Sequence, residues 1–241
     1  MTGRAGKRTR GERAGLSRPL VLDTALDLVD REGLRGLSMR RLGAALGVEA
    51  MTLYHYVPNK EALLDGLVER VFAEALPPAT EGTPWREQLI GYADSLRAAL
   101  LRHPGVLPLV VTRPMVTPAG LDAVERGLDA LTGAGFPLGR AVDALNALSL
   151  FVVGHTAGEV GVGDDADPEG RTPGSPGWLA RLDATRYPLL TEAARTGAGV
   201  DDQERFRFAV EALVAGFAQV EGDGTGDRAP VRDQRSVPLE R

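Results

Sequence analysis

Cysteine is absent from this chain of 241 residues, and lysine occurs only as Lys7 and Lys60. Without cysteine the chain cannot form a disulfide framework or a thiolate metal site. The sequence also lacks an apolar run of 18 residues and a signal-peptide pattern, so nothing in it points to a membrane or to secretion. We therefore expect a soluble cytoplasmic protein.

Reactive side chains are scarce as well. The three histidines, His55, His103 and His155, are far apart in the sequence, and we find no HExxH motif, no phosphate-binding glycine loop and no GxSxG in a strand-turn-helix setting. The acidic cluster 164–167 lies among Gly and Pro without EF-hand spacing, which is typical of a solvated charge run. The sequence thus predicts no enzyme, no metal site and no cofactor.

The alternation of apolar and polar residues that is typical of β-strands is missing throughout. Apolar residues recur instead at helical spacing, so we predict an all-α fold. The expected helices are 17–33, 38–46, 49–57, 60–76, 85–102, 117–131, 137–160 and 201–220, with short helical turns near 104–111 and 187–195. Ser17 and Thr117 are suitable N-caps for the helices that they begin.

The stretch 38–60 predicts two short helices joined by a tight turn. Ser38 is a suitable N-cap for the first helix, and Gly47 can adopt the left-handed conformation that ends it. The second helix is predicted to run from residue 49 to residue 57 and to end before Pro58. Its buried side holds Leu53 and Val57, which leaves Met51, Thr52, Tyr54, His55 and Tyr56 for the flanks and the outer face.

This outer face carries aromatic and small hydrogen-bonding residues where a solvated helix has Glu and Lys. A helix of about nine residues suits the major groove of DNA, which is about 12 Å wide. The alternative is an αα-corner that has no partner at all. From the spacing of the residues alone, both interpretations stay open.

The charge of the chain is unevenly distributed. Residues 1–60 carry 11 basic and 6 acidic side chains, so they have a net charge of +5 within a chain of net charge −5. The other 181 residues therefore carry −10. A basic module that is attracted to phosphate and an acidic module that is repelled by it fit this pattern. Residues 1–16 are a basic arm, expected to be disordered, that either contacts DNA or only aids solubility.

The run GLSMRRLGAALGVEAMTLYHYVPNKEALL, which ends at Leu64, strongly resembles the DNA-binding region of the tetracycline repressor (TetR) family. The likeness continues through Trp85, the Thr112-Arg113-Pro114 segment, Gly135-Phe136 and the stretch 187–190, which resemble the ligand-binding domain of the tetracycline-repressor subgroup. It covers roughly residues 17–219.

The resemblance implies an N-terminal three-helix DNA-binding domain with a helix-turn-helix, joined by a connecting helix to a larger helical domain that binds a ligand and dimerises. We expect domains at 17–76 and 84–220, a mobile loop at 161–177 and a disordered tail at 221–241. The residues expected to contact DNA are Ser38, Arg40, Arg41, Ala50, Met51, Thr52, Tyr54, His55, Tyr56 and Lys60.

The second domain departs from the tetracycline repressor where that protein holds its drug. The repressor's drug-contacting and magnesium-ligating polar residues align with Leu76, Tyr92, Leu96 and a position near Leu109, and Glu159 alone keeps a carboxylate. A magnesium–tetracycline ligand is therefore not expected, and an apolar or aromatic effector suits the site better. The candidate effector residues are Trp85, Tyr92, Leu96, His103, Leu109, Arg113, Asn146, His155 and Glu159.

These candidates have alternative interpretations. Trp85, Leu96 and Leu109 are also ordinary core residues, and His103 could simply cap the end of its helix. Polar groups such as Tyr92, Asn146 and His155 on apolar helix faces must bond either to a neighbour or to a ligand.

Helices 137–160 and 201–220 are apolar on more than one face. The resemblance implies that two such helices from each subunit form a four-helix dimer interface. The sequence thus predicts a homodimeric, ligand-responsive transcriptional regulator, most simply a repressor, on a pseudo-palindromic operator. Any signal between its domains is expected to pass through helix 60–76. The alternative is a DNA-binding protein whose second domain only dimerises or binds a protein partner.

Overall fold

The computed structural model describes residues 15–75, 82–113, 116–163, 176–198 and 201–219. Every regular element in these residues is a helix, so the prediction of an all-α fold is confirmed for them. The expectations for most of the basic arm, for Leu76 and the residues that separate the two predicted domains, for the acidic cluster 164–167 and for the C-terminal tail fall outside the described residues.

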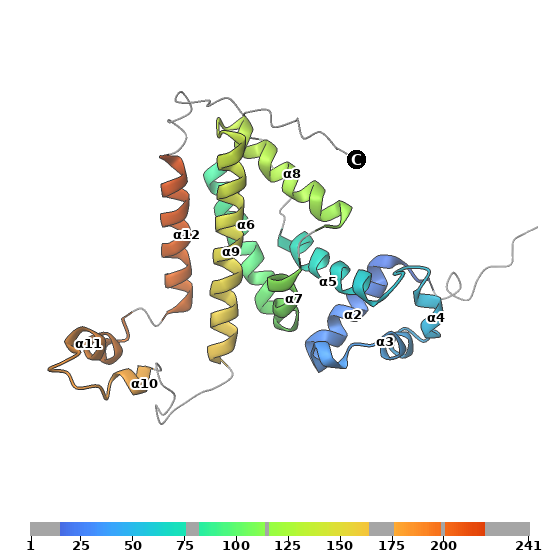
Figure 1. Cartoon of the computed structure of the whole chain (residues 1–241), viewed down its shortest axis with the longest axis horizontal. Coiled ribbons are helices and arrows are strands. Elements are labelled where there is room, and N and C mark those ends of the chain that lie inside the picture. The colour runs from blue at the N-terminus through green and yellow to red at the C-terminus, as the bar shows by residue number, and fades with distance from the viewer. Residues whose placement is uncertain (1–14, 76–81, 114–115, 164–175, 199–200, 220–241) are drawn as a thin grey trace, which may run out of the picture.

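The N-terminal module consists of α2, α3, α4 and α5 (Figure 1), and its buried apolar residues belong to a core cluster that continues into the larger domain. Its first helix is capped as expected, because the Ser17 hydroxyl accepts a hydrogen bond from the Leu20 amide. The elements are α2 (Arg18–Glu32), the 3-10 helix η1 (Leu34–Gly36), α3 (Met39–Ala45), α4 (Ala50–Leu53) and α5 (Lys60–Ala75).

The predicted second helix, 49–57, is wrong in length, because α4 is only Ala50–Leu53. After Leu53 the backbone tightens into turns, and the Tyr56 amide bonds to the Leu53 carbonyl three residues back. Pro58 disfavours a helical conformation at Val57 and cannot itself donate a helical hydrogen bond. The helix therefore ends earlier than its apolar spacing indicates.

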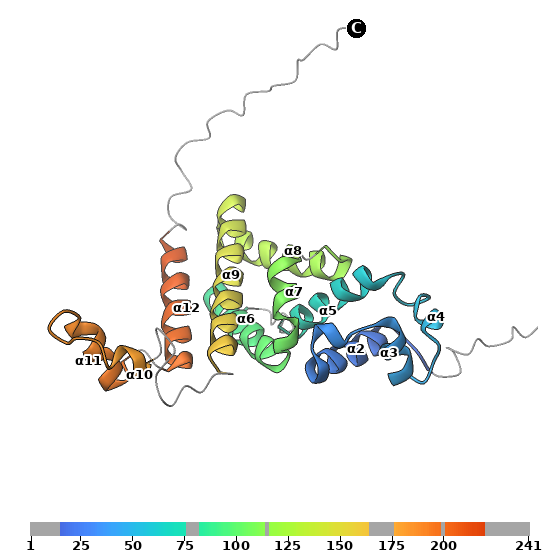
Figure 2. The ribbon, with the colours of Figure 1, turned by 60° about the horizontal axis from the view of Figure 1, so that its bottom comes forward.

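The larger domain is built from α6, α8, α9 and α12, with the short η2 and α7 beside the N-terminal module (Figures 1 and 2). α6 has the predicted bounds, Trp85–Arg102. The remaining elements are η2 (Pro104–Val106), α7 (Leu107–Thr112), α8 (Pro118–Gly133), α9 (Leu138–Gly163), α10 (Pro176–Leu179), α11 (Pro188–Thr196) and α12 (Asp202–Ala218). The short helices α10 and α11 pack on each other and stand apart from the other helices in both views.

α9 extends to Gly163, so residues 161–163 are helical where a loop was predicted. Likewise, α10 begins at Pro176, inside the predicted loop, and residues 164–175 lie outside the described part of the chain. One side of α9 buries Ala141, Leu148 and Val152, while Leu150 is 73% exposed. The apolar character of this helix on more than one face thus leaves an apolar surface on the single chain.

Candidate nucleic-acid interface and sensor core

The turn between α3 and α4 is set by three local features. The Ser38 hydroxyl accepts a hydrogen bond from the Arg41 amide and so begins α3 as predicted. Gly47 has a φ of +67°, the left-handed conformation expected of it. Gly43 is buried, and a Cβ at that position would lie 2.8 Å from the Val48 carbonyl oxygen. Only glycine lets the chain of α4 return this close to α3.

Sequence reasoning missed Gly43, because a glycine inside a helix carries no sign of what packs on it. The signal that could have found it is its place in α3, four residues before Gly47. A helix-internal glycine costs stability relative to alanine unless another segment needs the space.

The helix-turn-helix presents its predicted side chains as a surface. Leu53 and Val57 are buried, as expected, and fix α4 to the core. Met51 is 72% exposed, and Tyr54 and His55 are also exposed. Ala50, Thr52 and Tyr56 are half-buried, and Tyr56 packs partly against the core. Within the described residues, nothing covers an outward apolar side chain such as Met51.

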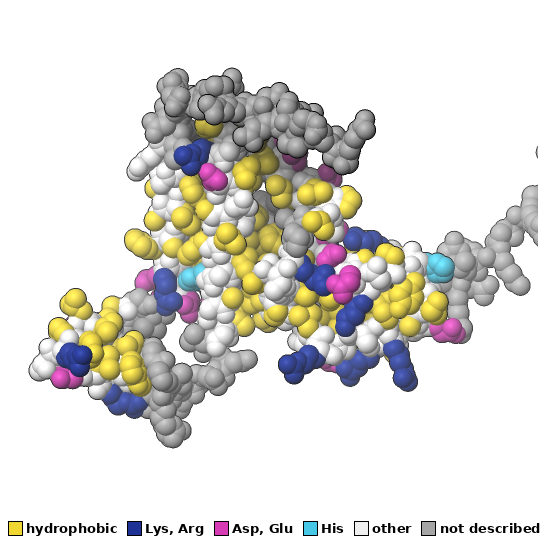
Figure 3. Space-filling view, in the orientation of Figure 1, with side chains coloured by type: hydrophobic (Ala, Val, Ile, Leu, Met, Phe, Trp, Pro, Cys, Tyr) yellow, Lys and Arg dark blue, Asp and Glu magenta, His cyan; other side chains and the backbone are white. Residues whose placement is uncertain are grey.

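Basic side chains border this surface in two different states. Arg40 is exposed, whereas Arg41 is held by the Glu32 carboxylate at 2.7 Å and by the Gly36 carbonyl at 3.2 Å. Figure 3 shows Lys and Arg side chains along the lower edge of the α2–α4 module. Arg40, which has no described ion pair, thus supplies positive charge beside the α4 surface.

Lys60 begins α5 and is exposed. Every other charged side chain of α5 is ion-paired to another element in the described structure, and Lys60 has no described ion pair. The paired residues are Glu61, Asp65, Glu69, Arg70 and Glu74. Lys60 is thus the cation of α5 that is available to a phosphate group.

The interior of the larger domain is apolar. The Trp85 ring meets the Phe136 ring edge to face, with centroids 4.8 Å apart. Leu96 and Leu109 are also buried. The structure therefore places all three apolar candidates, Trp85, Leu96 and Leu109, within the hydrophobic core.

One polar candidate, Tyr92, bonds across the interface between α6 and α9. The Tyr92 hydroxyl is 3.0 Å from the Ser149 hydroxyl, and burial raises the pKa of Tyr92, so this phenol stays neutral at physiological pH. The pair is a polar point in an apolar helix interface. It can donate or accept a hydrogen bond.

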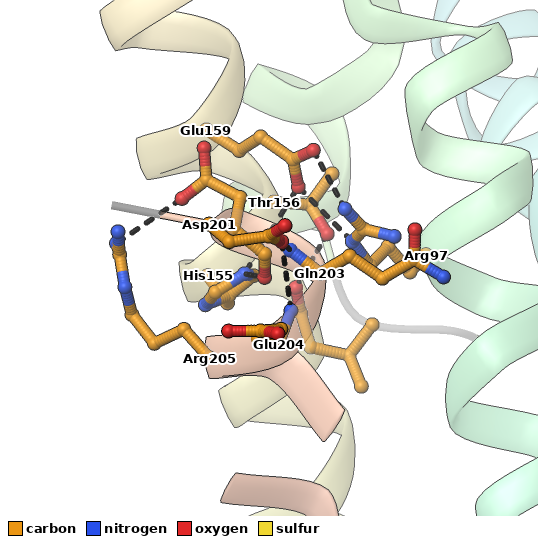
Figure 4. Close-up of polar contacts among 10 residues, drawn as sticks. Arg97, His155, Thr156, Glu159, Asp201, Gln203, Glu204 and Arg205 are labelled. Atoms are coloured by element: carbon orange, nitrogen blue, oxygen red, sulfur yellow. Dashed lines mark hydrogen bonds and ion pairs between the residues drawn. The ribbon is translucent and has the colours of Figure 1, made fainter. Parts of the chain in front are cut away.

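The other polar group joins α6, α9 and α12 (Figure 4). Arg97 donates from Nε and Nη2 to the two carboxylate oxygens of Glu159, at 3.0 and 2.7 Å. Its guanidinium also lies 5.1 Å from the centre of the Phe206 ring. Both oxygens of Glu159 thus bond to a cation supplied by the chain itself. Arg97 was not predicted from the sequence, since a basic residue on a helix does not reveal which acid it faces.

His155 completes this group. Its Nε2 is 3.2 Å from the Asp202 carbonyl oxygen, and its ring packs beside the Phe151 and Phe206 rings, with centroids 5.5 and 5.3 Å away, while those two rings stack on each other at 5.8 Å. His155 therefore bonds to a neighbour, which is one of the two outcomes expected for a polar group on an apolar face. It also fixes the start of α12, where the Asp201 side chain accepts hydrogen bonds from the amides of Gln203 and Glu204.

The remaining candidates are not brought together with these residues by any described contact. Asn146 is exposed on α9. His103 ends α6 as its C-cap residue and contacts Asp30 and Glu74, while Arg113 contacts Glu61 and Asp65. Both therefore face the N-terminal module, and their predicted part in effector binding stays a prediction. No group of three or more metal-ligating side chains, and no helix able to cross a membrane, occurs among the described residues.

Comparison with known proteins decides the family. Residues 21–67 match the sequence model of bacterial regulatory proteins of the tetR family, and residues 76–220 match that of the tetracyclin repressor-like C-terminal domain. The chain belongs to the TetR family. The resemblance found in the sequence is thus confirmed for both of its parts.

Relatives within the TetR family agree along most of the chain. It is 30% identical to the transcriptional repressor DrrR1 of Streptomyces coeruleorubidus, over 92% of this chain and 84% of that protein. It is 34% identical to the class D tetracycline repressor of Escherichia coli, over 85% and 90% of the two chains. The fold is similar to the crystal structure of ActR of Streptomyces coelicolor in complex with actinorhodin, with a TM-score of 0.73. The two sequences are 30% identical, and the match covers 86% of this chain and 99% of ActR.

As a TetR-family protein, the chain is a transcriptional regulator that binds DNA through its helix-turn-helix. The predictions of an all-α fold with an N-terminal DNA-binding domain, and of a regulatory function, are therefore confirmed. The related proteins are transcriptional regulators and not enzymes.

Proposed function

We propose that this chain is a homodimeric repressor that binds a pseudo-palindromic operator and releases it when a small apolar or aromatic effector binds. It has no catalytic role and works in the cytoplasm on operator DNA. The observation that carries the proposal is the exposed α3–α4 surface, joined through one helix, α5, to a helical domain with an apolar interior.

The DNA side of the proposal rests on the exposed residues around α4. Met51, Tyr54 and His55 present apolar and hydrogen-bonding groups to base edges, and Arg40 reaches the same groove from α3. Tyr56 and Lys60 hold the phosphate backbone. A phosphate contact by Arg41 would cost free energy, because Arg41 would first have to give up its ion pair with Glu32.

The dimer rests on the exposed apolar residues of α9 and α12. Leu150 is 73% exposed and Phe208 is 75% exposed. Figure 3 shows further apolar side chains at the surface of α9 and α12. A monomer gains nothing from such residues, whereas two copies packed through α9 and α12 bury them. A dimer also presents two copies of α4 to two half-sites about 34 Å apart.

The effector class follows from the side chains inside the larger domain. Tyr92 and Ser149 offer one polar point among apolar residues, and Glu159 is already bonded to Arg97. An apolar or aromatic molecule with few hydrogen-bonding groups fits this environment better than a charged metal chelate does.

The division into domains 17–76 and 84–220 is supported by the two family matches, 21–67 and 76–220.

Two experiments test the proposal. Selection of bound duplexes from random double-stranded DNA should enrich one sequence with two-fold symmetry. A thermal-shift screen of apolar metabolites and drugs should then find compounds that stabilise the protein and release the selected DNA. Failure to enrich any sequence would overturn the DNA part. Enrichment combined with silence across a broad screen would mean that the second domain only dimerises or binds a protein.

A further inference from the structure

Residues 102–113, the segment from the last residue of α6 through η2 and α7 to Arg113, contact the N-terminal module near both ends of α5. We infer that this segment, called the bracket below, fixes the position of the DNA-binding module, so that His103 and Arg113 help to select the spacing between operator half-sites. The inference rests on the proposed function and changes one expectation: α5 is the only covalent connection between the domains, but it is not the only path for a signal.

The first contact is a partly buried polar junction of three helices. His103 Nδ1 is 2.7 Å from a carboxylate oxygen of Asp30 on α2, and Nε2 is 3.6 Å from Glu74 on α5. Because a carboxylate can only accept, Nδ1 donates to Asp30. Arg102 also pairs with Glu74. The side chains of His103 and Asp30 are 14% and 23% exposed, so this bridge is less screened by solvent than a surface pair.

Beside this junction the two domains touch through backbone. A Cβ at Gly105, in η2, would lie 2.8 Å from Val29 Cγ1 and 3.0 Å from the Val29 carbonyl oxygen. η2 therefore packs on the end of α2 without room for a side chain. The polar bridge and the close packing hold the same end of α2, which belongs to the DNA-binding module.

The second contact lies at the opposite end of α5. Arg113 Nη1 is 2.7 Å from Asp65, and its Nη2 bonds to Glu61. These two hydrogen bonds raise the pKa of Arg113, with Glu61 as the larger cause. Glu61 follows Lys60, the residue assigned to phosphate. The bracket therefore holds α5 where it reaches the DNA as well as where it enters the larger domain.

A helix held at one end can pivot, whereas a helix held at both ends and through α2 cannot. In a dimer the separation of the two α4 helices depends on the angle of each DNA-binding module. If the bracket sets that angle, the intact protein should bind one half-site spacing and reject others. In a protein without the bracket contacts, the DNA-binding module should change its angle freely, so that operators with several half-site spacings are bound.

The test measures a ratio of two affinities of the full-length protein. One duplex is the operator selected from random DNA, and the other is the same sequence with one base pair inserted at its centre. For the wild type, the insertion should weaken binding by about tenfold or more, comparable with a mismatched base pair. Asp30→Ala and Arg113→Gln should each reduce this penalty by about two- to fivefold, the range of a partly exposed ion pair. Each substitution also changes the charge of the protein, which affects binding to both duplexes alike. The ratio of the two affinities therefore does not contain this effect.

Arg70→Gln is the matched control. Arg70 Nη2 is 2.6 Å from an Asp23 carboxylate oxygen. Arg70→Gln therefore also removes an ion pair between α2 and α5, but this pair lies wholly within the DNA-binding module. This variant should keep the wild-type penalty, and thermal unfolding checks that all three variants fold. Unchanged penalties in Asp30→Ala and Arg113→Gln, or an equal loss in Arg70→Gln, would overturn the inference. A wild type that selects no DNA at all would instead overturn the proposed function itself.

Discussion

Two basic residues near α4 are expected to play different parts in DNA recognition. Arg40→Ala should relax sequence preference by about 1–3 kcal/mol at one base pair, because it removes a contact to a base edge. Lys60→Ala should weaken binding to all sequences alike and lower the slope of log affinity against log salt by about one, because it removes a phosphate contact. Binding titrations on operator variants at several salt concentrations measure both effects. The assignment is wrong if Lys60→Ala changes base preference while Arg40→Ala leaves it intact.

Gly43 is the residue on which the α3–α4 turn depends most closely. In Gly43→Ala the new Cβ would lie 2.8 Å from the Val48 carbonyl oxygen and 3.1 Å from the Ala50 amide nitrogen, and neither backbone atom can turn aside. We expect a loss of about 1–3 kcal/mol in the free energy of unfolding, together with a loss of operator affinity as α4 moves.

The control for this change is Gly91→Ala, where a Cβ meets no atom within 4 Å. That substitution lies inside α6 and should stabilise the protein by up to about 1 kcal/mol. Denaturant unfolding and operator binding of the two variants give the comparison. Equal stability of Gly43→Ala and the wild type would show that the close approach does not constrain the turn.

Residues whose role is local could be predicted from the sequence, and residues whose role depends on a distant partner could not. Ser17, Ser38 and Thr117 cap the helices that directly follow them, and each was expected to do so. The partners of Arg97 and His103 lie 62 and 73 positions away in the chain. No local pattern encodes such a pairing.

At the scale of the elements, the same distinction explains which helix ends were predicted correctly. Both ends of α6 follow from its apolar spacing and from His103-Pro104 at its end. The end of α4 was missed because Leu53 and Val57 keep helical spacing although the backbone between them forms tight turns. α9 continues past Val160 because glycine, although a poor helix former, is compatible with a helical backbone.

The packing of α2 on α5 should depend on pH. The hydrogen bond from Arg18 lowers the pKa of Glu69 below its ordinary value. A lowered pKa in the folded state means that the stabilisation is present above the ordinary carboxyl pKa of about 4.3 and is lost as the pH falls through the folded-state value. Glu69→Gln should therefore cost roughly 1 kcal/mol at neutral pH, since Arg18 stays partly exposed, and progressively less in acid. Urea unfolding of both proteins between neutral and acidic pH measures this difference; a cost that does not shrink in acid contradicts the assignment.

At the scale of the whole molecule, the proposed dimer predicts that a charge on α9 is tolerated by the fold but not by the assembly. Leu150 is 73% exposed in the single chain, so Leu150→Glu should leave the free energy of folding of the monomer nearly unchanged. In the dimer it would bury a charge against apolar residues, so we expect monomers and a loss of operator binding of about a hundredfold or more.

The comparison variant is Leu121→Glu, at an exposed apolar residue on α8, outside the α9–α12 surface. It should remain dimeric. Sedimentation analysis of the two variants at the same concentration distinguishes the outcomes, and a Leu150→Glu protein that stays dimeric would place the interface elsewhere.

The central claim is that effector and operator compete through the conformation of one dimer. Linkage requires that an effector which weakens operator binding by a given factor is itself bound more weakly, by the same factor, when operator is present. The decisive measurement is the affinity of an effector found in the thermal-shift screen, titrated into the full-length protein with and without saturating operator. We predict weaker effector binding in the presence of operator, by about 5- to 150-fold. Equal affinities in the two titrations would contradict allosteric release.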